Sequence, residues 1–394
     1  MKKSITNSVD IVLLFGYLFL IIFCIPFTMR AIVYFLLAGM ILIHILYSCA
    51  SSKGLWLQKS HFTVICLIVL LCGGVFLTSE YSQLYLIKAY LPLLIVFLWI
   101  KNGELQPINK QSESIIWWLF FVFFIVEMIF TYMSGNSSFG FKSLFEDRNF
   151  RDFIIALFIV ISYEKKRYKG AIIVFLLRLI IFSGRGYVFF LVMYFGIKIL
   201  KKFRPRFFLR FSDWCGKPGR IFFLMMTLLS LLIAFSYLWV NTIGSLAQLS
   251  AVGGLRDMSN LERFNANVYA VEELLHNKEF FFSGYGGELI TSIFGLDYAE
   301  RELIRYNGVV LVQPHCAMLN LFMCFGIVPG FIYLIVMANL FRKVISFENV
   351  EILLAFLIYS MILWIFPNNG LEMVIFVICM LNNNKKKMTE GYIV

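Results

Sequence analysis

Long apolar runs recur along this sequence, and they constrain its fold more than any other feature. Of the 394 residues, 60% are hydrophobic and 44 are Phe, more apolar surface than a soluble chain can cover. A helix that crosses a bilayer needs about 20 residues, and about twelve runs approach that length. The runs are 9–25, 31–48, 62–78, 84–100, 115–133, 150–163, 171–183, 186–200, 221–240, 315–341, 351–366 and 369–381. The sequence therefore predicts an all-α polytopic membrane protein with about twelve transmembrane helices in one body.

The Lys and Arg residues indicate which ends of these runs face the cytoplasm. With the N-terminus inside, about two thirds of the 35 Lys and Arg fall in cytoplasmic segments, and the bias holds at every turn. Both termini are then cytoplasmic. The first run lacks a small-residue cleavage site, so we interpret it as a retained helix. The net charge of +12 is then a topology signal rather than a nucleic-acid-binding surface.

This topology divides the chain into three segments. Residues 1–240 hold transmembrane helices one to nine, and residues 315–394 hold helices ten to twelve with a basic cytoplasmic tail. Between them, residues 241–314 form an external loop far longer than a simple connection needs. Residues 259–276 of this loop have apolar positions three and four apart, as in an amphipathic helix, and Ser259 with Glu262 matches a capping box. A second short helix is predicted at about 298–306.

The sequence offers no pattern for a metal or a cofactor. The eight cysteines are scattered and the four histidines have no metal-ligand spacing. There is no G-x-x-x-x-G-K-[ST] motif and no D-x-D pair in an early external loop. We therefore expect an activity that uses neither ATP nor a metal ion.

Three cations fall at membrane depth, biased toward the external half. Arg185 lies between two glycines in the short external turn after the seventh run, Arg178 lies seven residues earlier, and Lys88 lies near the outer end of the fourth run. An ionisable residue in the membrane is a functional candidate, and glycine-flanked N–H groups at a helix start favour phosphate. The structural alternative is that Arg178 and Lys88 pair with Glu127 and hold the bundle together.

The external loop adds further candidates. It carries nine Asp and Glu against five Lys and Arg, so its arginines do not follow from topology. Arg263 lies on the polar face of the predicted helix, Arg256 precedes that helix, and Arg305 shares a face with Arg301 in the second one. The alternative for each is a solvated surface position.

The loop ends in QPHCAMLNLF, which places His315 beside Pro314 at the start of the tenth run. Pro fits the first turn of a helix. In that turn the helix dipole favours neutral imidazole, which can accept a proton from a hydroxyl group. The alternative is an interfacial histidine that reaches the lipid headgroups.

Four stretches together resemble one family. They are FSGRGYVFF, LERFNANVYAVEELLHNKEFFFSGYGGE, QPHCAMLNLFMCFGIVPGF and, more weakly, FKSLFEDRNFRDF. In order, spacing and common external face they resemble the motifs of bacterial O-antigen polymerases and ligases. Cys316 departs from the pattern, because the family usually has Asn at that place.

The resemblance implies a metal-independent, inverting glycosyltransferase of the GT-C type in the bacterial inner membrane, with its active site facing the periplasm. Its donor and acceptor would be oligosaccharides on undecaprenyl pyrophosphate, and a chain-length regulator is a further candidate partner. Arginine forks match phosphate oxygens and stabilise a departing pyrophosphate. The expected catalytic residues are His315, Arg263 and Arg185. The expected substrate-binding residues are Arg178, Arg256, Lys88, Tyr285 and Arg305.

Three other functions stay open at the level of sequence. A ligase would use the same donor and motifs but transfer the glycan to lipid A–core. A transporter for a lipid-linked oligosaccharide would explain cations in the spans, but not the long structured external loop that ends in His315. A structural scaffold is the remaining alternative.

Overall fold

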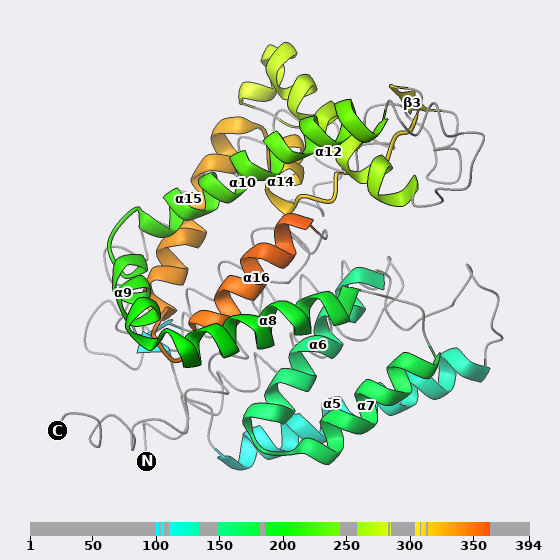
Figure 1. The fold of residues 1–394 in the computed structure, drawn as a ribbon, viewed down its shortest axis with the longest axis vertical. Helices are drawn as coiled ribbons and strands as arrows, with labels where there is room; N and C mark the ends of the chain where they lie inside the picture. Colours follow the sequence, from blue (N-terminus) through cyan, green and yellow to red (C-terminus); the bar gives the residue numbers. More distant parts are fainter. Residues whose placement is uncertain are drawn as a thin grey trace, which may run out of the picture.

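The described part of the chain consists mainly of α-helices (Figure 1). This computed structural model describes residues 100–101, 104–105, 110–133, 148–181, 186–244, 258–282, 284, 304–307, 309–312 and 314–362. Two antiparallel hairpins accompany the helices. Their strands are β1 (Ile100–Lys101) with β2 (Glu104–Leu105), and β3 (Arg305–Tyr306) with β4 (Val309–Val310). The predicted all-α class is confirmed for the described residues.

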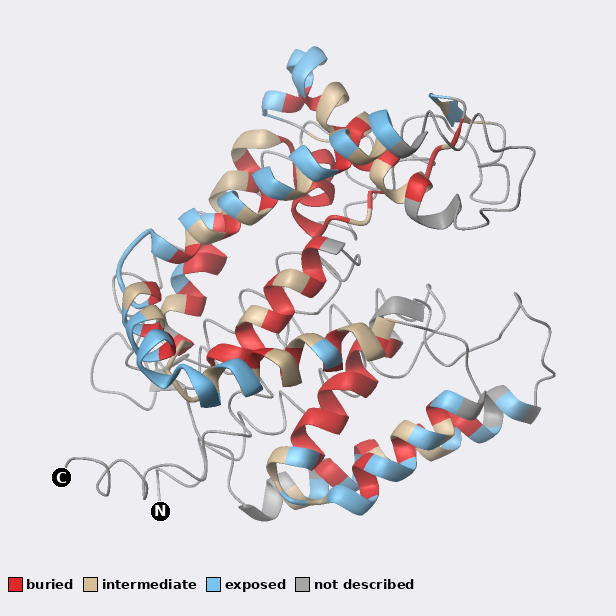
Figure 2. Cartoon of the chain, in the orientation of Figure 1, coloured by how far each residue is buried: buried red, intermediate tan, exposed pale blue. Residues whose placement is uncertain are grey.

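The first group of helices packs around α6. Its members are α5 (Lys110–Met133), α6 (Arg148–Glu164), α7 (Tyr168–Ile181) and α8 (Gly186–Phe203). Every residue of α6 from Phe153 to Ser162 is buried, as expected of a helix that is apolar all round. By contrast, α5 and α7 expose apolar side chains such as Trp118 and Ile172, and Figure 2 shows this difference. The predicted helices at 115–133, 150–163, 171–183 and 186–200 are confirmed as helices.

A short helix that we did not predict joins α8 to α10. Helix α9 (Pro205–Cys215) lies in a stretch expected to be a cytoplasmic connection. The sequence feature that indicates this helix is Pro205 at its first position. Proline lacks an N–H, and an N–H in the first turn of a helix has no partner within the helix. Helix α10 (Arg220–Trp239) then begins after Gly219, at φ 74°, and continues as a π-helical turn, Val240–Gly244.

The external loop contains the predicted amphipathic helix. Helix α12 (Met258–His276) packs on α10 and is followed by a single 3₁₀ turn, η2 (Lys278–Phe281). The capping box is wrong, because the helix begins at Met258 and Ser259 lies inside it. The helix predicted at 298–306 is also wrong at its end, since Arg305 and Tyr306 form strand β3.

The predicted tenth run is not one helix. It is divided into α14 (Ala317–Phe325) and α15 (Ile327–Val344) at Gly326, whose φ of 93° an α-helix does not allow. A Cβ on Gly330 would lie 2.3 Å from Cδ1 of Phe322, so α14 folds closely against α15. At nine residues, α14 is about 14 Å long, too short to cross a bilayer. Helix α16 (Val350–Ile362) confirms the start of the predicted run at 351–366.

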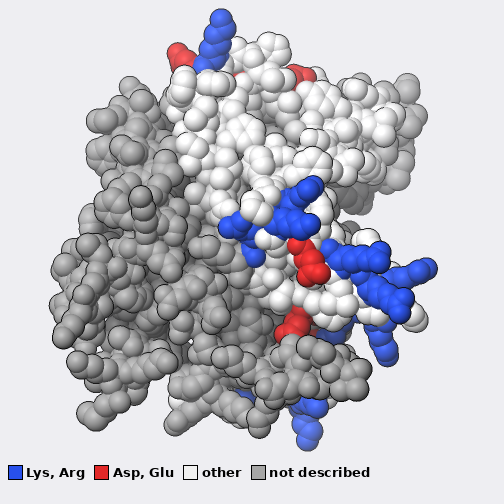
Figure 3. All heavy atoms as spheres, turned by 90° about the vertical axis from the view of Figure 1, so that its left-hand side faces the viewer, with Lys and Arg blue, Asp and Glu red and all other residues white. Residues whose placement is uncertain are grey.

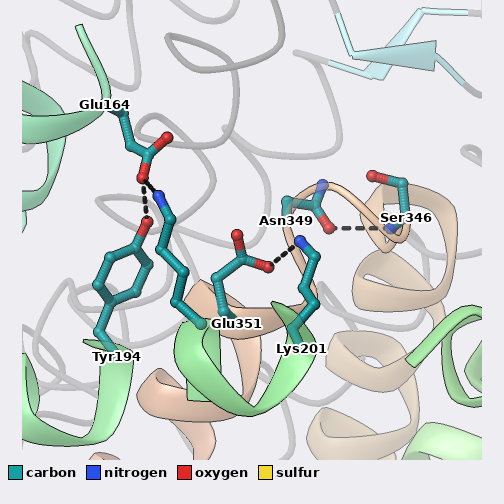
Figure 4. A network of polar contacts seen from close by, with 7 residues as sticks. Glu164, Tyr194, Lys201, Ser346, Asn349 and Glu351 are labelled. Atoms are coloured by element: carbon teal, nitrogen blue, oxygen red, sulfur yellow. Dashed lines mark hydrogen bonds and ion pairs between the residues drawn. The ribbon is translucent and has the colours of Figure 1, made fainter. Parts of the chain in front are cut away.

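The helices give the bundle two polar ends. We call the end with Asp152, Arg178 and Tyr359 the Arg178 end, and the opposite end the Lys201 end. At the Lys201 end, Lys201 Nζ donates to Glu351 Oε2 at 2.6 Å, which ties α8 to α16. Lys198 and Tyr194 both donate to Glu164 at the end of α6 (Figure 4).

A capped turn leads into α16 at the same end. Asn349 Oδ1 accepts a bond from the N–H of Ser346 at 2.8 Å (Figure 4). Its Nδ2 donates to the carbonyl of Val344 at 2.7 Å. The side chain thus satisfies a carbonyl that the end of α15 leaves open and an N–H of the turn itself. This turn fixes the position of Glu351 in the first turn of α16.

Among the described residues, one helix is both long and apolar enough to cross a membrane. It is Arg220–Thr242, and only 22% of its most apolar window is buried. Shorter apolar helices are Trp117–Ile129, Ile327–Arg342 and Val350–Met361. The runs predicted at 9–25, 31–48, 62–78 and 369–381, and nearly all of 84–100, lie outside the described residues.

Candidate functional site

A buried ion pair lies at the centre of the Arg178 end. Arg178, in the last turn of α7, donates through Nη2 to Asp152 Oδ1 near the start of α6. Arg178 is 0% and Asp152 2% exposed. The ring centroid of Tyr187 on α8 lies 5.3 Å from Cζ of Arg178. A buried cation needs such a partner, so the geometry favours the structural alternative for Arg178, with Asp152 as a partner that we did not predict.

Gly186 brings the start of α8 and helix α16 to this ion pair. A Cβ at this position would lie 2.9 Å from the hydroxyl oxygen of Tyr359 and 3.4 Å from Asp152 Oδ2. The start of α8 therefore lies against both α16 and α6, so closely that a larger residue at this position would have to displace the Tyr359 hydroxyl. Gly186 directly follows Arg185 in the chain, so the turn predicted to bind an anion leads into this cluster.

Tyr359 holds α16 in the cluster through its ring. It stacks on Phe153 of α6 with centroids 5.6 Å apart and contacts Phe190 of α8 edge-on at 5.5 Å. Nothing in the sequence singled out Tyr359, because its neighbours come from distant helices. Asp152 did carry a signal, as an acid at the edge of an apolar run within the fourth resembling stretch.

The segment with His315 reaches the same end of the bundle. His315 is partly exposed and precedes Cys316, the residue that caps α14. Cys316 Sγ lies 4.0 Å from Sδ of Met361, which follows Tyr359 by two residues on α16. Our placement of His315 and Pro314 in the first helical turn is wrong, because α14 begins at Ala317. His315 therefore lies just outside the helix, where the dipole acts more weakly.

Helix α12 carries Arg263 over the end of α10. Phe264 packs against Phe235 and Trp239, with ring centroids 5.3 and 5.5 Å away. One turn on, Asn267 Nδ2 approaches Ser236 Oγ at 3.4 Å. These contacts fix the partly buried Arg263 on a helix that is docked rather than free in solvent.

The hairpin β3–β4 packs on another side of α12. Asn265 Nδ2 donates to the carbonyl of Tyr306 at 2.7 Å, and the Tyr306 hydroxyl donates to Glu272. Burial and the bond to Glu272 raise the pKa of Tyr306 to about 12. Arg305 is exposed on β3 instead of sharing a helical face with Arg301, so the geometry gives no support to its predicted binding role.

The G-x-G turn of the loop touches α14. A Cβ on Gly284 would lie 2.4 Å from the carbonyl carbon of Cys324 and from the carbonyl oxygen of Met323. The backbone of Gly284 therefore rests directly on the backbone of α14. Four predicted site residues, Arg185, Arg256, Lys88 and Tyr285, lie outside the described residues.

The structure thus places parts of all four resembling stretches against α14 or near the end of α16. No protein-family model, curated protein or solved structure matches the chain. Within the described parts of the chain, no group of three or more His, Cys, Asp or Glu is arranged to hold a metal ion.

Proposed function

We propose that this chain is an inner-membrane glycosyltransferase that polymerises lipid-linked oligosaccharide repeats. It would transfer the nascent glycan from undecaprenyl pyrophosphate to the non-reducing end of a new lipid-linked repeat. The Arg178 end would face the periplasm and the Lys201 end the cytoplasm. The fold would be GT-C-like, with about twelve transmembrane helices.

The observation that carries the proposal is the convergence of separate motifs. Gly186 of FSGRGYVFF lies against Tyr359 and Asp152, and the QPHC segment reaches α16 two residues from Tyr359. Gly284 of the external loop rests on α14. The sequence separates these stretches by tens of residues or more, and nothing in a generic helical bundle requires them to meet.

A membrane location is supported by the contacts between helices. The pairs Arg178–Asp152, Lys201–Glu351 and Cys316–Met361 each join residues that the charge bias assigns to one side of the membrane. Residues Arg220–Thr242 are long and apolar enough to span, and α5 and α7 expose apolar side chains as lipid-facing helices do.

The chemistry needs a site for a dense anion and an acceptor for a proton. The acceptor sugar hydroxyl attacks the anomeric carbon of the donor from the face opposite the pyrophosphate. A carbon–oxygen bond forms there as the bond to phosphate oxygen breaks, and the pyrophosphate departs with the electron pair. Arg185 and Arg263 would stabilise that anion, and His315 would accept the hydroxyl proton or orient the hydroxyl.

Arg178 acts differently in this scheme. Its guanidinium is neutralised by Asp152, so it contributes little attraction for an anion in solution. We assign it a positioning role: the pair fixes the end of α7 and the start of α8, on either side of the turn that contains Arg185. Arg256, Lys88 and Tyr285 keep their predicted places as binding residues, outside the described part of the chain.

The test is a lipopolysaccharide gel from a strain that lacks the protein. We expect core capped with a single repeat and no ladder, because ligation survives while polymerisation is lost. Bare core with accumulating lipid-linked polymer would indicate the ligase instead. An unchanged ladder would contradict both and leave a transporter as the next function to test.

Complementation then tests the named residues. Arg185→Ala, Arg263→Ala and His315→Ala should each remove the ladder while the protein stays inserted and abundant by immunoblot. Arg185→Lys should restore it poorly, because a point charge does not replace a bidentate fork. Normal ladders from all three alanine variants would remove this site from the proposal.

A further inference from the structure

Helix α9 packs one face on the bundle and leaves the other open. Its buried residues, Phe208, Ser212 and Cys215, follow a helical spacing and face the protein. The helix contacts α8 and α10, whose ends it joins. The open face is unusual in composition, because aromatic rings and cations alternate along it.

The rings of that face form a ladder. Phe207 stacks on Phe211 with centroids 6.2 Å apart, and Phe211 stacks on Trp214 at 6.0 Å. The guanidinium of Arg220 lies 5.4 Å from the Trp214 ring. Phe207 is 61% exposed and Phe203, at the end of α8, is 75% exposed. Both rings lie where α8 joins α9, and large rings this exposed are costly in water.

Cations surround this ladder. The exposed ones between residues 202 and 220 are Lys202, Arg204, Arg206, Arg210, Lys217 and Arg220. Asp213 is the one acid in that stretch. Figure 3 looks onto the side of the bundle where α9 lies and shows Lys and Arg gathered there, with few acids among them. The surface therefore suits an anionic partner that also has an apolar part.

The position of α9 in the fold indicates which of these anionic partners it meets. Helix α10 starts at Arg220, shortly after α9 ends, and it is the described helix that is long and apolar enough to span a membrane. If α10 spans, α9 lies at the boundary between lipid and water. An amphipathic helix at that boundary buries its rings at the level of the headgroups and places its cations beside the phosphates.

We infer that the open face of α9 binds anionic phospholipid headgroups of the leaflet at the Lys201 end, chiefly through Arg206 and Arg210. The exposed rings of Phe203 and Phe207 enter the boundary between headgroups and acyl chains, where they are no longer exposed to water. The cations thus do more than set topology. This inference needs α10 to span the membrane but does not depend on the proposed glycosyl transfer.

The experiment uses the full chain purified in a neutral detergent and two fluorescent lipids, phosphatidylglycerol and phosphatidylcholine. Wild type should prefer phosphatidylglycerol, and salt should weaken that preference. Arg206→Gln/Arg210→Gln should weaken phosphatidylglycerol binding by about ten- to thirtyfold, with phosphatidylcholine binding unchanged. Arg206→Lys/Arg210→Lys keeps the charge and should retain most of the binding, which excludes simple misfolding as the cause.

A matched control removes two other cations from the same end. Lys166 and Lys169 are exposed at the turn between α6 and α7. Lys166→Gln/Lys169→Gln should change binding by less than about threefold, because these residues lie outside the α9 face. An equal loss from both glutamine pairs would contradict a site on α9. So would a wild type with no lipid preference, or soluble glycerol phosphate competing as well as the lipid.

Discussion

The two polar ends of the bundle use the same kinds of residues in different ways. At the Arg178 end, a single ion pair is wholly buried and crowded by Gly186, Tyr187 and Tyr359. At the Lys201 end, the Lys198–Glu164 side chains are 31% and 25% exposed, and the Lys201–Glu351 side chains 13% and 7%. The Arg178 end is fixed by a fully buried pair, whereas the Lys201 end has one pair that is partly exposed and one in which only the lysine is partly exposed.

This difference indicates where a precise site can be built. A buried pair cannot lose one partner without leaving a charge in apolar surroundings, so its geometry is held strictly. Partly hydrated pairs tolerate rearrangement, since water replaces a lost partner. Cys316, next to His315, and Gly186 both lie against α16 at the strictly held end, as the proposed site for a pyrophosphate and a hydroxyl would require.

The largest effect should come from Asp152→Ala, which leaves Arg178 buried without this carboxylate. We expect a loss of about 3–5 kcal/mol in the free energy of unfolding. Thermal unfolding in detergent and immunoblots of membranes would measure it. A variant as stable as wild type would contradict the strict packing of the Arg178 end.

A double variant separates structure from chemistry at this pair. Arg178→Met/Asp152→Leu replaces the pair with apolar side chains and should recover the abundance lost in Asp152→Ala. If Arg178 only positions the turn before Gly186, the lipopolysaccharide ladder should return as well. A stable double variant without a ladder would mean that the Arg178 cation acts on substrate itself.

Gly186→Ala should have the next largest effect, because its Cβ would lie 2.9 Å from the Tyr359 hydroxyl. We expect a cost of about 1–3 kcal/mol and a weakened ladder. Tyr359→Phe in the same chain removes the hydroxyl and should restore part of both.

Gly196 on the same helix provides the matched control. A Cβ there would meet no atom of the described chain within 4 Å. Gly196→Ala should therefore be neutral or stabilising by about 0.5–1 kcal/mol. Equal effects at the two glycines would argue against the close approach at Gly186.

A smaller effect is expected at the other end from Lys201→Met. Glu351 is 5% exposed and loses its charged donor with little water to replace it, so the cost should be about 1–3 kcal/mol. The ladder should persist. Loss of the ladder in a stable Lys201→Met protein would show that the Lys201 end also takes part in the reaction.

The smallest effect should come from Lys198→Met, whose partner Glu164 also accepts a bond from Tyr194. Because both charged side chains are about a quarter exposed or more, we expect a change of about 0–1 kcal/mol. A loss as large as that of Asp152→Ala would remove the distinction between the two ends. The same thermal unfolding series would reveal it.

Features that depend on local pattern could be predicted from the sequence. The lengths of the apolar runs predicted α5 to α8, α10 and α16, and the spacing of Leu261, Phe264 and Val268 predicted α12. Two features that we failed to predict also had signals in the local sequence. Gly326 followed by Pro329 signals the division of the tenth run, and Pro205 signals the start of α9, but the surrounding apolar and basic residues obscure both signals.

Partners across helices depend on the tertiary structure alone. The sequence marks Arg178 as a cation that needs a partner, but the crossing of α6 and α7 selected Asp152. Similarly, the sequence shows only that Gly186 lacks a side chain. The packing of α16 shows that the Tyr359 hydroxyl lies where that side chain would be. The physical reason is that spacing along a chain fixes which residues share a helical face, while packing between helices decides which faces meet.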